Sequence, residues 1–213
     1  MKTDELITSL SMNVEPVNRR LVDRNVGLAL AVGAVVAIGI TFIVLGVRTD
    51  LATPRAVIFL FLKLALAIGT VGAAAVYLAR LARPAGERRV SPGLAALPFV
   101  AILLLAGISL GQAPSSHWDK MVMGEDWLEC LISIPVIAIV PFAVVIWAVR
   151  KAAPTNLVRT GAFSGLVAGG VSAIGYALHC TDDSLPFVAL WYGGTIVLCT
   201  LAGSFLGPRL LRW

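Results

Sequence analysis

Six long apolar runs limit the folds open to this chain of 213 residues. Each run is close to the ~20 residues that a helix needs to cross the hydrocarbon core of a bilayer. Runs of this length without alternation of polar and apolar residues favour helices over strands. The sequence therefore predicts transmembrane helices at residues 26–47, 56–79, 94–111, 128–149, 157–178 and 187–206.

The composition agrees with this prediction. Hydrophobic residues make up 58% of the chain and charged residues only 14%, with a mean hydropathy of +0.90, whereas a soluble domain carries roughly a quarter charged residues. The connections between the runs leave no room for a soluble catalytic domain. We expect an all-α integral membrane bundle of six transmembrane helices (residues 26–213), a short cytoplasmic N-terminal segment (residues 1–25), no enzyme activity and no cofactor.

Lysines and arginines are distributed unevenly between the two ends of the predicted helices. Positive residues collect on the cytoplasmic side of membrane proteins, so both termini, the 80–93 connection and the 150–156 connection are predicted to be cytoplasmic. These charges flank the spans and form no basic domain, so the net charge of +5 indicates topology rather than direct binding of nucleic acid. The cytoplasmic set comprises Lys2, Arg19, Arg20, Arg24, Arg80, Arg83, Arg88, Arg89, Arg150, Lys151, Arg159, Arg209 and Arg212.

A short polar island between the last two runs carries most of the reactive side chains. It contains His179 and Cys180, followed by Asp182 and Asp183. Counted from the 150–156 connection, Cys180 lies at nearly the same depth as Cys130, which begins the fourth run, and both face the oxidising side. Cys199 lies in the middle of a span, where a cysteine is a small buried hydrophobe.

Three interpretations of Cys130 and Cys180 are compatible with the sequence. They form a disulfide or thiol switch, they bind a metal together with His179, His117 and nearby carboxylates, or they are unlinked packing residues. The chain has no CxxC or HxxxH spacing, which leaves the metal without an obvious ligand set.

Lys63 is the one cation expected inside a span. An ammonium group in lipid must pair or reach the interface, so we expect an ion pair, for example with Glu129; a role in ion or proton movement is the alternative. Glycines repeat every fourth residue at Gly161, Gly165 and Gly169 and again at Gly203 and Gly207. Such stripes allow close helix packing, either within the bundle or in a homodimer.

The N-terminal segment is the element best suited to bind a cytoplasmic partner. Asp4 and Glu5 fit the first turn of a short helix, and Leu6, Ile7 and Leu10 fall on one face of it. Such a helix docks in the groove of a soluble protein or lies on the membrane surface; the sequence leaves both open.

The whole chain resembles the NrsF-type membrane anti-sigma factors. The similar segments are the opening Met1–Ile7, the stretch Gly46-Val-Arg48-Thr-Asp50-Leu51, Lys63, Arg83-Pro84-Ala85-Gly86, His179-Cys180-Thr-Asp182-Asp183-Ser, Phe187, Trp191-Tyr192 and the terminal Leu211-Arg212-Trp213. Ala85 departs from the Arg-Pro-Gly expected in its loop, and Asp182 stands where the family pattern has Glu.

This resemblance implies an extracytoplasmic-function sigma factor as partner, held at the bacterial inner membrane by residues 1–20. It also implies that Cys130 and Cys180, with His179 beside them, sense a stress such as a heavy metal or an oxidant. The alternative functions are a small transporter or a quinone-linked thiol oxidoreductase. A transporter often shows an internal repeat and polar positions near the midplane, and the sequence shows neither.

Overall fold

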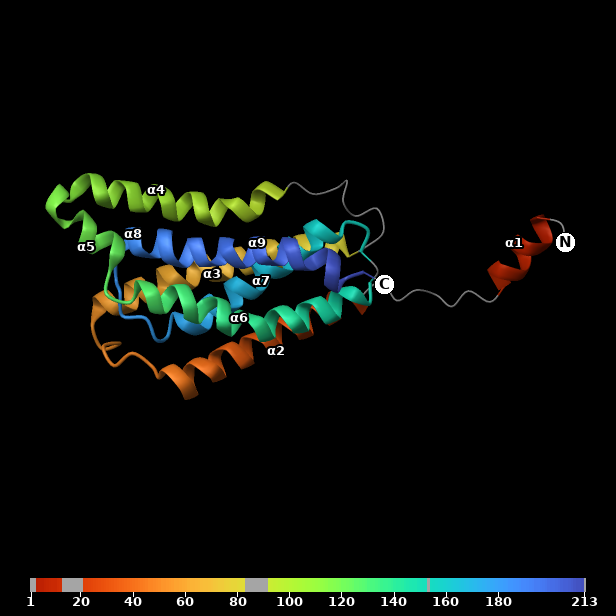
Figure 1. The fold of residues 1–213 in the computed structure, drawn as a ribbon, viewed down its shortest axis with the longest axis horizontal. Coiled ribbons are helices and arrows are strands. Elements are labelled where there is room, and N and C mark those ends of the chain that lie inside the picture. The colour runs from red at the N-terminus through yellow and green to blue at the C-terminus, as the bar shows by residue number, and fades with distance from the viewer. Residues whose placement is uncertain (1–2, 13–20, 83–91, 153, 213) are drawn as a thin grey trace.

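The apolar runs form helices, shown in the computed structural model of Figure 1, which describes residues 3–12, 21–82, 92–152 and 154–212. The helices are α1 (Thr3–Met12), α2 (Leu21–Ile40), α3 (Pro54–Leu81), α4 (Leu97–Gln112), α5 (Trp118–Met123), α6 (Trp127–Arg150), α7 (Leu157–Tyr176), α8 (Leu185–Phe187) and α9 (Gly193–Leu210). Two π-helical segments belong to these helices: Thr41–Leu45 extends α2, and Val188–Tyr192 joins α8 to α9. Short 3-10 turns, Pro92–Ala96 and Ser115–His117, precede α4 and α5.

Six helical segments are long and apolar enough to cross a membrane, in the order that the sequence predicts. The all-α class and the six spans are confirmed on these terms, and the described ranges contain no strand. Helix α2 starts within the predicted N-terminal segment, because Asp23 suits a first helical turn. The segments are Val22–Leu45, Pro54–Leu81, Gly93–Gln112, Ser115–Arg150, Leu157–Tyr176 and Leu185–Leu210.

Helix α7 forms the centre of the bundle, with α2, α3, α6 and α9 packed around it. It is narrow because most of its buried residues are glycine, alanine or serine. A Cβ atom added to Gly161 would collide with the carbonyl oxygen of Gly203, and one added to Gly165 with the carbonyl oxygen of Cys199. The two glycine stripes therefore pack α7 against α9 within one chain, and a homodimer would need another surface.

The outside of the bundle is apolar. Leu104 on α4 is 64% exposed and Phe61 on α3 is 67% exposed, and α4 lies at one edge of the bundle in Figure 1. Large apolar side chains on an outer surface are stable in contact with lipid, whereas in water they would favour aggregation.

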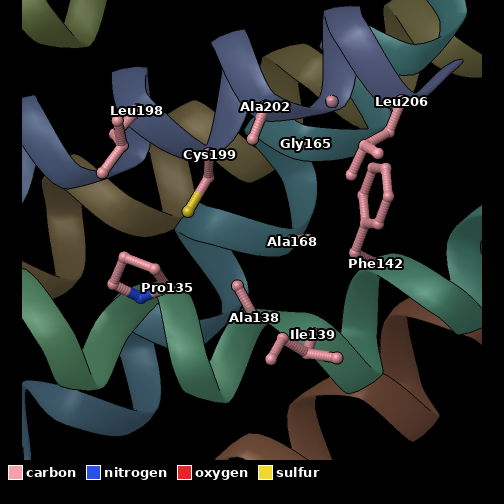
Figure 2. Close-up of a pocket in the computed structure, with 11 residues that line it drawn as sticks. Pro135, Ala138, Ile139, Phe142, Gly165, Ala168, Leu198, Cys199, Ala202 and Leu206 are labelled. Atoms are coloured by element: carbon pink, nitrogen blue, oxygen red, sulfur yellow. The ribbon is translucent and has the colours of Figure 1, made fainter.

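An apolar groove of about 230 Å³ runs between α6, α7 and α9 (Figure 2). Pro135 and Ala138 line its α6 side, and Cys199 points from α9 toward α7. Cys199 is buried, as predicted.

The two ends of the bundle differ in charge. We call the end with the α2–α3 and α7–α8 connections and α5 the polar end, and the end with the α6–α7 connection and the C-terminus the basic end. At the basic end, Nη2 of Arg150 donates to the carbonyl of Arg212 over 3.5 Å, which holds the C-terminus against α6. The start of α2 lies at this same end, as an even number of spans requires.

Candidate functional site

Arg48 lies at the centre of the polar end. The chain leaves α2 at Gly46, whose φ of +82° suits a residue without a side chain. Two residues later, the backbone N–H of Arg48 donates to the carbonyl of Leu178 over 3.0 Å, which fixes the α2–α3 connection to the end of α7. The side chain of Arg48 is fully buried.

The guanidinium of Arg48 binds two carboxylates. Its Nε lies 2.6 Å from Oδ1 of Asp50, and its Nη2 lies 2.8 Å from Oδ2 of Asp183. Nη1 donates to the carbonyl of Cys180 over 3.0 Å. Hydrogen bonds to Asp50 and Asp183 raise the pKa of Arg48, and the hydrogen bond from Arg48 lowers the pKa of Asp50.

Lys63 completes this arrangement from α3. Its fully buried ammonium group donates to the carbonyl of Cys180 over 2.9 Å and lies 3.5 Å from Oδ1 of Asp183. The predicted ion pair is confirmed, but Glu129 as its partner is wrong, because Glu129 pairs with His179 instead. We call Arg48, Asp50, Lys63 and Asp183 the charge cluster; its two cations meet two carboxylates, as buried charges require.

His179 connects three parts of the fold. Its Nδ1 lies 3.1 Å from the carbonyl oxygen of Gly46, and its Nε2 lies 2.9 Å from Oε1 of Glu129 at the start of α6. These two contacts tie the end of α7 to the α2–α3 connection and to the start of α6.

Asp182 fixes the other side of the polar island. Its carboxylate accepts from the backbone N–H of Glu125 over 3.0 Å and of Asp126 over 2.8 Å, just before α6 begins. A carboxylate in this position is stabilised by the helix dipole. The side chain of Thr181 donates to Asp126 over 3.1 Å, so the 179–183 connection is tied to α6 as well as to α3.

Cys130 and Cys180 both lie at this end, in the first turn of α6 and directly after α7. Both are free thiols with no exposed surface. Burial raises the pKa of the Cys180 thiol, so it stays protonated near neutral pH. The buried hydroxyl of Tyr176 nearby has no hydrogen-bond partner among the described residues.

The predicted metal ligands do not converge in the part of the chain that the structure describes. No group of three or more His, Cys, Asp or Glu side chains there could hold a metal ion. His117 lies on the turn before α5, with its Nδ1 3.3 Å from the hydroxyl of Ser116. A metal ion bound at the two thiols would therefore have the sulfurs of Cys130 and Cys180 as its protein ligands.

The residue patterns alone did not predict the central position of Arg48 and Asp183 in the charge cluster. Arg48 is a lone cation directly after an apolar run, at the acidic end of the molecule. That position was a signal for a buried ion pair, but the partner follows only from the fold.

The predicted partner-binding residues lie on α1, away from the bundle in Figure 1. Asp4 and Glu5 occupy the first turn, Leu6 is 42% exposed and Ile7 is 59% exposed. The side chain of Leu10 lies outside the described part of the structure. The fold thus does not bring α1 together with the cysteines.

Comparison with known proteins identifies the family. A family model described as "Negative regulator of sigma F" matches residues 10–213. The chain is 32% identical to the anti-sigma-F factor NrsF of Caulobacter vibrioides and 28% identical to the probable anti-sigma-F factor NrsF of Azospira oryzae, each over the full length of both chains. No solved structure matches. The chain therefore belongs to the NrsF family of negative regulators of sigma F.

Proposed function

We propose that this negative regulator of a sigma factor works at the bacterial inner membrane, where it holds a sigma factor of the extracytoplasmic-function class. In this proposal α1 binds the sigma factor in the cytoplasm, and Cys130, Cys180 and His179 sense stress at the periplasmic end. The family is regulatory rather than catalytic. The observation that carries the sensing role is that one carbonyl, that of Cys180, accepts hydrogen bonds from both Arg48 and Lys63.

This carbonyl couples the thiol to the charge cluster. A change at Cys180 that moves its backbone weakens two charge-assisted hydrogen bonds in a buried site, where each is stronger than in water. Arg48 belongs to the α2–α3 connection and Lys63 to α3, so the disturbance reaches helices that run to the basic end. That is a physical route from the sensing end toward the start of α2, which follows the α1 segment.

Two kinds of signal fit a pair of buried thiols. In the first, an oxidant such as hydrogen peroxide takes two electrons and two protons from Cys130 and Cys180, a disulfide forms, and the peroxide is reduced to two waters. In the second, a soft metal cation replaces the two thiol protons and binds both sulfurs. Either change alters packing at two positions without exposed surface, so the surrounding helices must adjust.

Helix α1 supplies the docking surface. Leu6 and Ile7 are exposed on a short helix that has acidic residues in its first turn, a form that binds in an apolar groove with a basic rim. Complete burial of such a side chain contributes roughly 1.5–3 kcal/mol. The two residues together therefore account for an affinity change of several orders of magnitude.

A pull-down of the sigma factor tests this role. Leu6→Asp with Ile7→Asp should abolish co-purification of the sigma factor and leave the protein in the membrane fraction. Thr8→Asp is the matched control, because it adds a carboxylate to the opposite face of α1 and should retain binding. Undiminished capture by the double variant would exclude α1 as the docking element.

Sigma-dependent transcription tests the sensing role. Cys130→Ser and Cys180→Ser should both block induction by a thiol-reactive stress, and the double variant should add little, because two members of one unit are not additive. Cys199→Ser is the control and should induce normally. Normal induction in the Cys130/Cys180 double variant would return both residues to a packing role.

Reporter fusions test the orientation. A fusion at the C-terminus should report the cytoplasm, and one inserted within residues 112–126 should report the periplasm. Two fusions on the same side would refute the arrangement with both termini cytoplasmic.

A further inference from the structure

We infer that a groove at the basic end, between the start of α7 and the end of α9, binds the headgroup of an anionic phospholipid. The groove has a volume of about 680 Å³ and is lined by Val158, Ser204, Phe205, Pro208, Arg209 and Arg212. This inference rests on the proposed function in one respect, that the bundle spans a bilayer.

Two arginines provide the anion-binding part of the groove. Arg209 lies in the last turn of α9, Arg212 follows two residues after the helix ends, and both line the groove. Both are exposed. Nη1 of Arg209 donates to the carbonyl of Phe205 over 3.4 Å, which is at the long limit of a hydrogen bond and easily exchanged for a phosphate oxygen.

The rest of the groove suits an acyl chain. Phe205 is 71% exposed and Val158 is 53% exposed, and with Pro208 they form an apolar wall that continues from the arginines along the bundle. The hydroxyl of Ser204 is occupied by the carbonyl of Leu201 over 2.7 Å. A free phosphate ion would use only the arginines, whereas a phospholipid covers the wall as well, so the lining favours the lipid.

The surroundings of the groove are also positive. Arg150 touches the C-terminus through the carbonyl of Arg212, and Nζ of Lys151 lies 3.5 Å from the ring centre of Trp147, an arrangement common at the level of lipid headgroups. Asp23 is the one carboxylate among the described bundle residues at this end. A basic pocket between helices at the cytoplasmic side is the type of site that holds acidic headgroups.

Lipid retention by the purified protein provides the test. The protein is reconstituted in nanodiscs with equal amounts of phosphatidylglycerol and phosphatidylcholine, extracted into mild detergent, and analysed for bound lipid by native mass spectrometry. We expect phosphatidylglycerol to be retained roughly 10- to 30-fold over phosphatidylcholine, as two arginines near the surface predict. Arg209→Gln with Arg212→Gln should reduce the ratio to about one.

Two controls each remove one positive charge elsewhere. Arg24→Gln lies at the basic end but on α2, outside the groove, and Lys120→Gln lies on α5 at the polar end; both should keep the preference. Equal retention by the wild type and the Arg209/Arg212 variant, or displacement of the lipid by millimolar inorganic phosphate, would overturn the inference. Extraction of the wild type from membranes by alkaline carbonate would instead refute the membrane location itself, before any lipid is compared.

Discussion

Removal of the shared carboxylate should destabilise this protein more than any other single change in the charge cluster. Asp183 faces Arg48 at 2.8 Å and Lys63 at 3.5 Å, and both cations have fully buried side chains. In Asp183→Asn, Lys63 keeps its hydrogen bond to the carbonyl of Cys180 but loses its carboxylate, whereas Arg48 keeps Asp50. Removing one partner of a buried pair costs about 3–5 kcal/mol, so we expect a loss of unfolding free energy in this range.

Asp50→Asn is the matched comparison. Asp50 binds the same guanidinium, but its side chain is 42% exposed, so solvent screens the pair and the loss should stay near or below about 1 kcal/mol. Combining Asp183→Asn with Lys63→Met should recover part of the loss, because the unpaired buried ammonium is then absent.

The assay is reversible unfolding in mixed micelles with increasing SDS, monitored by tryptophan fluorescence. Equal losses for Asp183→Asn and Asp50→Asn would refute the reasoning, because it derives the difference from burial alone. A double variant less stable than Asp183→Asn would also refute it, because the loss is attributed to the unpaired ammonium group of Lys63.

Three further predictions concern acid stability, helix packing and thiol access. Arg48 lowers the pKa of Asp50, so the stability that ionised Asp50 contributes is complete above the ordinary carboxyl pKa and is lost as the pH falls through the lowered pKa. The difference in unfolding free energy between wild type and Asp50→Asn, measured at pH 6 and in steps below pH 4, should therefore disappear only in the acid steps. A difference that does not depend on pH would contradict this. Gly203→Ala should lower the unfolding free energy by about 1–3 kcal/mol through overpacking against α7. Gly194→Ala on the same helix meets nothing within 4 Å and should leave the unfolding free energy unchanged in the same assay; equal effects would argue against the close α7–α9 contact. Cys180 is buried and its pKa is raised, so maleimide labelling at pH 7 should be slow in the native protein and fast after denaturation, and equal rates would show that the thiol is accessible.

The sequence predicts the helices of this protein well because their hydrophobic pattern is simple, with long apolar runs separated by short polar connections. Long apolar runs and flanking arginines locate six spans without any knowledge of their packing. The pairing of Lys63 with a carboxylate was also predictable, since an unpaired ammonium inside a span is too unfavourable to persist. Both predictions need only local information, namely one apolar run or one charged residue considered by itself.

The partners within the polar end were less predictable. Lys63 pairs with Asp183 rather than Glu129 because the connection after α7 folds back over the start of α3, where Arg55 donates to the carbonyl of Asp183 over 3.0 Å. The burial of Arg48 likewise depends on Leu178, far away in the chain. Such contacts depend on the rotation of each helix about its axis and on the conformation of the loops. Neither can be predicted from the spacing of residues in a single sequence.

Under the proposed membrane location, the narrow central helix has a consequence for how the protein is inserted. Of the six candidate spans, α7 is the least hydropathic and the segment ending in α9 is the next least, yet α7 is the most enclosed by protein. Glycine, serine and threonine contribute little to spontaneous partitioning from the translocon into lipid, so α7 is a weak insertion signal by itself. Its close glycine contact with α9 suggests biogenesis as a helical hairpin, in which the two late spans leave the translocon together and complete an assembly already formed by the more hydrophobic spans before them.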